Sequence, residues 1–309
     1  MRAGAAGIPR GLLQPRAQPA AGRAGEGPAV TPPPPHPPTP CPGRFAGRVA
    51  LVTGGGSGIG EAICRRLAAE GALVAVNDLQ PQRAQAVAAA LSARGAVALA
   101  VPADVGDPRQ VDDMFRQAEE RLGTVTVLVN NAGIQFPIAG REVDPETGQR
   151  PQPRTSLDLF RLLTYEELSR MLRTNLVGTW LCTCRALEGM LAAGGGAIVN
   201  VSALAALAGQ WYGIHYTAAK AGVVGLTRAL ARAYCPRGIQ VNAVAPGYTD
   251  TPMLEPVRRW GGLPGFLAHV PMGRLATPDE IAALVAYLAS PEASYLAGQT
   301  INISGGLVI

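Results

Sequence analysis

A glycine-rich turn between an apolar run and a helical pattern constrains the fold of this chain most. Residues 49–52 are Val-Ala-Leu-Val, a short apolar run that indicates a buried strand. Residues 53–60, Thr-Gly-Gly-Gly-Ser-Gly-Ile-Gly, follow at once and lead into a helical pattern that ends at Gly71. Such a turn lets the backbone approach a pyrophosphate, and the helix N-terminus offers free N–H groups and a positive dipole end. The segment therefore predicts the strand, turn and helix that open a dinucleotide-binding fold.

Apolar runs and helical segments keep alternating after this turn. Nearly unbroken apolar strands that alternate with helices form parallel sheets covered on both faces. We therefore expect an α/β fold with a doubly wound parallel sheet, in a single Rossmann-type domain over residues 45–309. The further strands are expected at residues 72–78, 96–101, 125–129, 197–201, 239–244 and 299–303.

Three helices have clear start signals. Asp107 precedes Pro108, which suits a capping residue followed by proline at the first helical position. Thr164 and Thr277 each stand three residues before a glutamate, the pattern of a capping box.

Polar or turn-forming residues stand where these strands end. Ligands of parallel α/β sheets bind at the carboxyl ends of the strands, so these residues are expected to share one site. They are Gly54, Asp78, Asp104, Asn131, Ser202 and Pro246.

Asp78 ends the second expected strand, 18 residues after Gly60. A carboxylate at about this spacing binds the adenosine ribose of a dinucleotide and repels a 2′-phosphate. Residues 77–82 contain no Arg or Lys. We therefore expect NAD(H) to be preferred over NADP(H), with Asp78 as a cap of the next helix being the alternative.

Lys220 is the only lysine of the chain, which otherwise takes its positive charge from 26 arginines. Tyr216 precedes it by four residues, so on a helix the two side chains lie on one face. A close, partly desolvated ammonium can lower the pKa of a phenol, whereas an arginine fork suits carboxylates and phosphates. The alternative, a solvated helix lysine, does not explain why lysine occurs only here.

The ends and loops of the chain differ in composition from its strands and helices. Residues 1–44 are rich in Pro, Ala, Gly and Arg and are expected to be a disordered tail, because they have little to bury. Residues 134–163 form a polar inserted loop, and residues 249–275, rich in Pro and Gly, form a substrate lid.

Charge and cysteine content restrict partners and compartment. The formal net charge is +5, but the tail carries most of it, so we expect no nucleic-acid partner. The five cysteines lack metal-ligand spacing, so we expect that the protein binds no metal. We expect the cysteines to be free thiols in a cytoplasmic, reducing compartment. No apolar run reaches the length that spans a bilayer, so we expect no membrane association.

Together these motifs resemble the short-chain dehydrogenase/reductase family over residues 47–306, and the ending 298–306 resembles its tetrameric members related to 3-oxoacyl-carrier-protein reductases. The resemblance implies hydride transfer between a secondary alcohol and its ketone, in a homotetramer, with a 3-oxoacyl thioester as one candidate ketone. Tyr216 would be the general acid and base. Ser202 would bind the alkoxide, Lys220 would hold the nicotinamide ribose, and Asn175 would position a water linked to Lys220. The implied cofactor contacts are Gly54, Ser57, Gly58, Ile59, Gly60, Asp78, Asp104, Val105, Asn131, Ala132, Gly133, Tyr216, Lys220, Pro246, Gly247, Thr249 and Thr251.

Two readings of the function stay open on the sequence. The chain is either this NAD(H)-dependent oxidoreductase or a non-catalytic dinucleotide-sensing or scaffold protein of the same fold. Further candidates for substrate contact, each with ordinary packing or a solvated surface as its alternative, are His215, Tyr212, Trp211, Trp260 and the arginines of the inserted loop.

Overall fold

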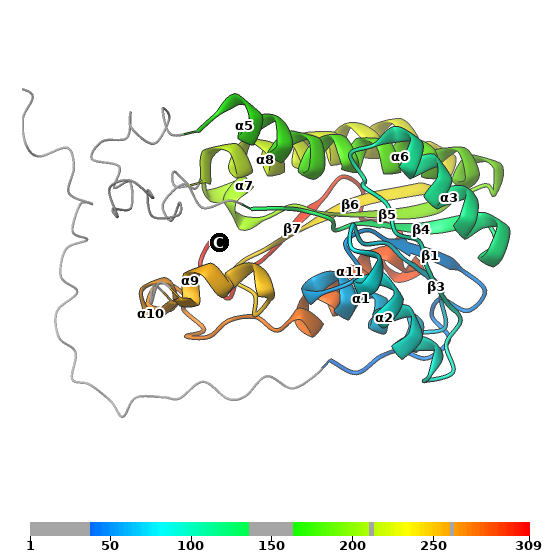
Figure 1. The fold of residues 1–309 in the computed structure, drawn as a ribbon, viewed down its shortest axis with the longest axis horizontal. Coiled ribbons are helices and arrows are strands. Elements are labelled where there is room, and N and C mark those ends of the chain that lie inside the picture. Colours follow the sequence, from blue (N-terminus) through cyan, green and yellow to red (C-terminus); the bar gives the residue numbers. More distant parts are fainter. Residues whose placement is uncertain (1–37, 136–162, 210–212, 260–262) are drawn as a thin grey trace, which may run out of the picture. The chain divides into compact units, whose positions relative to one another are not determined.

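A seven-stranded parallel sheet forms the centre of the protein (Figure 1). The computed structural model describes residues 38–135, 163–209, 213–259 and 263–309. The strand order is β3-β2-β1-β4-β5-β6-β7. Strands β2 and β3 are added on one side of β1, and strands β4 to β7 on its other side, so the order of addition switches between β1 and β4. The predicted doubly wound sheet is thus confirmed. Its strands are β1 (Val49–Val52), β2 (Leu73–Val76), β3 (Ala98–Ala100), β4 (Val125–Asn130), β5 (Gly196–Val201), β6 (Ile239–Pro246) and β7 (Thr300–Ile303).

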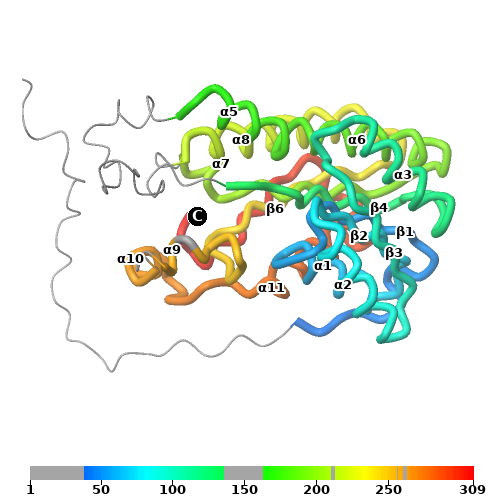
Figure 2. Tube along the Cα trace, in the orientation of Figure 1, coloured from blue at the N-terminus to red at the C-terminus, as the bar shows by residue number. Residues whose placement is uncertain are grey.

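Helices cover both faces of the sheet. Successive strand residues point to opposite faces, and a strand that is apolar throughout, such as β1, therefore has two apolar faces to bury. Ala50 and Val52 pack in the core beneath α1 (Gly58–Ala69), α2 (Pro81–Ser92) and α11 (Pro278–Ala289). Val49 and Leu51 pack in the core beneath α3 (Pro108–Leu122), α6 (Gly178–Ala192) and α8 (Ile214–Tyr234). Figure 2 shows α1 and α11 side by side, although they come from opposite ends of the described chain.

The three expected helix starts are confirmed. The Asp107 side chain accepts hydrogen bonds from the N–H groups of Arg109 and Gln110 at the start of α3. Both threonine capping boxes are complete: Thr164 begins α5 (Tyr165–Leu172), and Thr277 begins α11.

Shorter elements complete the described chain. The π-helix η2 (Arg173–Val177) joins α5 to α6, and α7 (Leu204–Ala208) follows β5. The predicted lid, expected to be irregular, contains three short helices: η5 (Pro252–Leu254), α9 (Glu255–Arg259) and α10 (Leu263–Leu267). Two single turns, η4 (Cys235–Arg237) and η6 (Pro291–Ala293), lie after α8 and α11. Of the predicted inserted loop, residues 136–162 lie outside the described residues.

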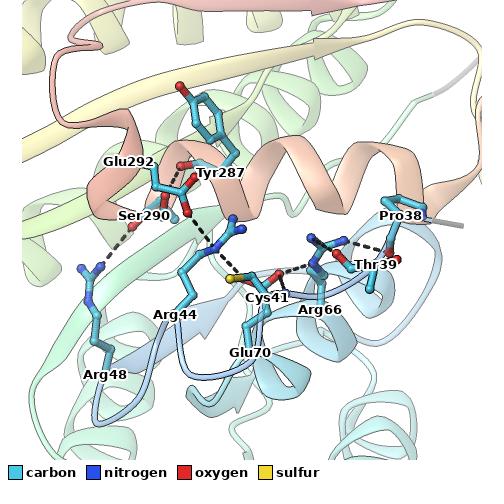
Figure 3. Close-up of polar contacts among 11 residues, drawn as sticks. Pro38, Thr39, Cys41, Arg44, Arg48, Arg66, Glu70, Tyr287, Ser290 and Glu292 are labelled. Carbon is cyan, nitrogen blue, oxygen red and sulfur yellow. Dashed lines mark hydrogen bonds and ion pairs between the residues drawn. The ribbon is translucent and has the colours of Figure 1, made fainter.

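Residues 38–48 contact α1 and the end of α11 (Figure 3). Arg66 of α1 donates hydrogen bonds to the carbonyl oxygens of Pro38 and Thr39, 3.1 and 2.9 Å long. The Cys41 N–H donates to Glu70, and Arg44 forms ion pairs with Glu70 and Glu292, both 3.3 Å long. Contacts with the fold therefore begin before residue 44, the last residue of the tail predicted from composition. Composition did not reveal these contacts because they are made by backbone groups and charged side chains, not by apolar side chains.

Candidate active site

Most of the residues predicted for the site line one cavity at the carboxyl ends of the strands. The glycine-rich turn, the end of β4, the segment after β5, the first two turns of α8 and the segment after β6 all border it. This cavity lies where the strand order reverses, as the topology predicts. The predicted residues that line it are Ile59, Asn131, Gly133, Ser202, Tyr216, Lys220, Pro246, Gly247, Thr249 and Thr251.

Tyr216 and Lys220 lie next to each other on α8, with the ammonium nitrogen 5.8 Å from the centre of the phenol ring. Both side chains are buried. Burial lowers the pKa of Lys220 to about 8 and raises the pKa of Tyr216 above its ordinary value. The expected lowering of the phenol pKa is therefore not seen in the chain alone, because loss of water outweighs the neighbouring cation. The proximity itself is as predicted.

Ser202 follows β5 and is held against α8. Its hydroxyl donates a 2.9 Å hydrogen bond to the Lys220 carbonyl oxygen, while the Lys220 ammonium donates a 2.7 Å bond to the Val201 carbonyl oxygen. These two bonds tie the end of β5 to the turn of α8 that carries Lys220. They orient the Ser202, Tyr216 and Lys220 side chains around the same cavity.

Asn175 lies in the π-helix η2 and is fully buried. Its side-chain oxygen accepts a 2.8 Å hydrogen bond from the Ile134 N–H, and its amide donates a 2.9 Å bond to the Ile134 carbonyl. A Cβ placed on Gly133 would lie 2.9 Å from this Asn175 oxygen and 3.4 Å from the Lys220 nitrogen. Asn175 and Lys220 thus border the same small space. A π-helical turn, common at functional sites, could not be read from the helical pattern.

The glycine-rich turn has no room for side chains. A Cβ on Gly60 would lie 2.1 Å from the Gly54 carbonyl oxygen, and one on Gly54 would lie 2.8 Å from the Ala132 Cα. Asn131 donates to the carbonyl oxygens of Thr53 and Gly54, so the turn and the end of β4 are tied together. The bare backbone beside the N-terminus of α1, where Ser57 stands in the cap position, fits a dinucleotide pyrophosphate.

Thr53 and Gly56 belong to this cradle, although neither was among the predicted cofactor contacts. The Thr53 hydroxyl accepts hydrogen bonds from the N–H groups of Asn131 and Ala132, each 3.0 Å long. A Cβ on Gly56 would lie 2.7 Å from an Asp78 carboxylate oxygen. The position of Thr53 at the end of β1 was the available signal.

Asp78 is buried two residues after the end of β2 and faces Gly56 of the glycine-rich turn. Its other oxygen accepts a hydrogen bond from the Gln80 N–H, and Gln80 is the residue that caps α2. Asp78 is therefore not the cap of that helix. Arg83 directly follows residues 77–82, which hold no Arg or Lys, and its Cβ is 2.6 Å from a Cβ placed on Gly56. The sequence argument missed this neighbouring cation.

The segment after β3 contacts η2 and the start of α6. Arg173 forms an ion pair with Asp104, and its Nε donates a 3.3 Å hydrogen bond to the Gly106 carbonyl. Val105 is buried, and a Cβ on Gly178 would lie 2.7 Å from its side chain. The predicted contact Asp104 is thus held by η2, the helix that carries Asn175, and Val105 packs against the start of α6.

The lid supplies an apolar side of the cavity. Its residues Met253, Leu254, Val257 and Phe266 line the cavity together with Tyr248, whose ring meets Phe266 edge to face at 5.0 Å. Thr249 and Thr251 also line it, and Thr251 alone packs against the glycine-rich turn, 3.2 Å from a Cβ placed on Gly58.

The remaining candidates fall in two groups. His215 is buried in α8. Trp211, Tyr212, Trp260 and the arginines of the inserted loop lie outside the described residues.

Within the described ranges, no cluster of three or more His, Cys, Asp or Glu side chains could hold a metal ion. Among the same residues, no helix is both long and apolar enough to cross a membrane.

Comparison with known proteins relates this arrangement to a family. A family model described as enoyl-(acyl carrier protein) reductase matches residues 54–308. Cis-4-hydroxycyclohexanecarboxylate dehydrogenase of Sinomonas cyclohexanicum is 42% identical over 267 residues, covering 85% of this chain and 97% of that protein. A short-chain dehydrogenase/reductase of Armillaria gallica is 39% identical over 271 residues, with 85% and 96% covered. A 3-oxoacyl-[acyl-carrier-protein] reductase of Synechocystis sp. is 36% identical over 264 residues, with 85% and 97% covered. The chain belongs to the short-chain dehydrogenase/reductase family.

Membership of the short-chain dehydrogenase/reductase family confirms the resemblance drawn from the motifs and makes the protein a member of an oxidoreductase family. The relatives named above include a dehydrogenase and a reductase. The direction of the reaction and its substrate therefore have to be argued from the cavity of this chain.

Proposed function

We propose that the protein is an NAD(H)-dependent oxidoreductase that interconverts a secondary alcohol and its ketone, with Tyr216 moving the proton. The observation that carries this proposal is the convergence of three buried groups on one cavity. These are the Tyr216 phenol, the Lys220 ammonium and the Ser202 hydroxyl, and the cavity is also bordered by the glycine-rich turn through Ile59. A site for proton transfer and a site for a dinucleotide are thus continuous.

The chemistry divides between the cofactor and the chain. When bound, the nicotinamide gives a hydride to the carbonyl carbon or accepts one from the alcohol carbon. In the reducing direction Tyr216 donates its phenolic proton to the substrate oxygen, and in the oxidising direction it takes that proton back. Ser202 donates a hydrogen bond to the oxygen as negative charge develops there. Its hydroxyl turns away from the Lys220 carbonyl to do so.

Lys220 has the task of making proton transfer from Tyr216 possible at neutral pH. Burial alone disfavours the phenolate, so a positive charge has to offset that cost. Lys220 is the only cation among the described residues that line the cavity. Asn175 and Lys220 border the space beside Gly133, which supports a water there that links Lys220 to solvent.

We propose NAD(H) as the preferred cofactor because the Asp78 carboxylate faces Gly56 of the glycine-rich turn, where it would bind the adenosine ribose. Gly54, Ser57, Gly58, Gly60 and Ala132 would hold the pyrophosphate side, with Asn131, Pro246 and Gly247 beside the nicotinamide. A homotetramer, as the resemblance implies, and a cytoplasmic location belong to the same proposal. The five free cysteines support a reducing compartment.

The test is the Tyr216→Phe variant, measured with a panel of ketones and secondary alcohols and with NADH or NAD. We expect turnover to fall by about 10²–10⁴-fold, the usual effect of removing a general acid or base. The affinity of the variant for NADH, measured by fluorescence titration, should stay unchanged. Binding of NADH without turnover by the wild-type chain on any substrate would instead favour a dinucleotide sensor.

A further inference from the structure

We infer that the substrate is a neutral ketone or secondary alcohol with an apolar body, not one whose body carries a carboxylate or phosphate. This inference rests on the proposed function and adds a substrate class to it. It follows from the side chains that the lid and α7 turn toward the cavity, and from where the charges of the lid lie.

The part of the cavity wall that α7 and the lid supply is largely apolar. Leu204 of α7 is buried on one side. Met253, Leu254, Val257 and Phe266 line the other side, from three consecutive helices of the lid. Met253 is 44% exposed, so an apolar ligand that covers it removes apolar surface from water. An anionic ligand group at the same place would lose its hydration without a cationic partner among the described residues of this wall.

The cations of the described lid are already paired with carboxylates. Arg258 forms an ion pair with Asp250 at 2.5 Å, and Arg259 forms one with Glu255 at 3.2 Å. Arg274 donates two hydrogen bonds to Glu280, 2.9 and 2.8 Å long. None of these three guanidinium groups belongs to a residue that lines the cavity. The charges of the lid are thus balanced within the lid and its neighbouring helix.

Lys220 does not serve as an anion partner for the substrate body. Its ammonium donates to the Val201 carbonyl and lies beside Gly133, on the cofactor side of the cavity. The relative from Sinomonas cyclohexanicum acts, by its name, on a hydroxycyclohexanecarboxylate. We therefore expect this chain to differ from that relative in how it treats a carboxylate on the substrate ring.

A matched pair of ketones tests the inference. Methyl 4-oxocyclohexanecarboxylate and 4-oxocyclohexanecarboxylate share ring and ketone and differ in the charge of one group at pH 7. We expect kcat/KM for the ester to exceed that for the acid by about tenfold or more, and binding to the NADH complex by calorimetry to show the same order.

A single added cation should weaken this selectivity. Met253→Lys places an ammonium in the apolar wall and should reduce the ester-to-acid ratio by about tenfold, since it gives the carboxylate a partner. Met272→Lys is the matched control. Met272 is 56% exposed and does not line this cavity, so the ratio should stay unchanged.

The outcomes separate this inference from the proposed function. Equal or better turnover and binding of the acid by the wild-type chain overturns the substrate class but leaves the oxidoreductase proposal standing. Failure of the ester to bind the NADH complex also overturns the substrate class. Absence of turnover on every ketone and alcohol of the wider panel overturns the proposed function, and calorimetry on the ester and the acid still decides the class.

Discussion

Lys220 illustrates the physical conflict at the centre of this site. Burial lowers its pKa to about 8, so the fold disfavours the charged form that the proposed mechanism needs. The two hydrogen bonds between α8 and the end of β5 hold this lysine in place despite that cost. An isolated buried cation is tolerated where its charge has a use, which is why perturbed groups mark functional sites.

The lowered pKa of buried Lys220 predicts an unusual pH dependence of stability. Between pH 8 and 10 the unfolded chain keeps the lysine proton and the folded chain loses it, so the contribution of Lys220 to stability should rise with pH, against the opposite contribution of the buried thiols Cys64 and Cys182. A shift from the ordinary value to about 8 corresponds to a gain of about 2 kcal/mol over this range. Urea unfolding of wild type and Lys220→Met at both pH values measures the difference. The gain should be absent in Lys220→Met and kept in Arg228→Met, which removes an exposed cation of the same helix. Equal slopes in all three proteins would contradict the assigned burial.

Asp78 and Arg83 predict how cofactor choice can be changed. The carboxylate of Asp78 repels a 2′-phosphate, while Arg83 stands beside the same glycine and can bind one. Asp78→Ala should therefore shift the NADPH-to-NADH ratio of kcat/KM toward NADPH by about tenfold or more. The double variant Asp78→Ala/Arg83→Ala should lose most of that gain. Equal use of NADPH and NADH by the wild type would refute the role given to Asp78.

At the scale of elements, the sequence predicted type and order better than local irregularity. The seven strands, the caps Asp107, Thr164 and Thr277, and the convergence at the strand ends followed from periodicity and strand chemistry. The π-helix η2 did not, because a π turn has the same apolar pattern as the α-helix around it. Nor did the raised pKa of Tyr216, since burial depends on tertiary packing that spacing cannot report.

The contact between η2 and the segment after β3 carries a prediction at this scale. Arg173 holds Asp104 and Gly106, so its loss should loosen a predicted cofactor contact without touching Tyr216. The Arg173 side chain is 54% exposed, and such pairs contribute at most about 1 kcal/mol. Arg173→Met should therefore raise KM for NADH by up to about fivefold with kcat nearly unchanged. Arg121→Met removes an exposed arginine of α3 and should leave both constants as they are. A fall in kcat instead would assign Arg173 to the chemistry.

At the scale of the whole molecule, the boundary of the fold depends on charge as well as on the apolar core. Composition placed the start of the domain at residue 45, because residues 1–44 have little to bury. Phe45 is fully buried. The buried carboxylate of Glu70, however, takes partners from both sides of this position: Cys41 and Arg44 before it, and Arg66 from α1 (Figure 3).

Two truncations test where the fold begins. A chain that starts after residue 37 keeps each of these contacts, whereas one that starts after residue 44 leaves Glu70 without Cys41 and Arg44 and leaves Arg66 without Pro38 and Thr39. Losing a hydrogen-bonding partner of a buried charged group costs about 1.5–3 kcal/mol. The shorter chain should therefore unfold at lower urea concentration with an unchanged m-value, while the longer one should match the full chain. In the shorter chain, Glu70→Gln should recover part of the loss, because a neutral amide needs the missing cation less than a buried carboxylate does. Equal midpoints for the two truncations would return the boundary to residue 45.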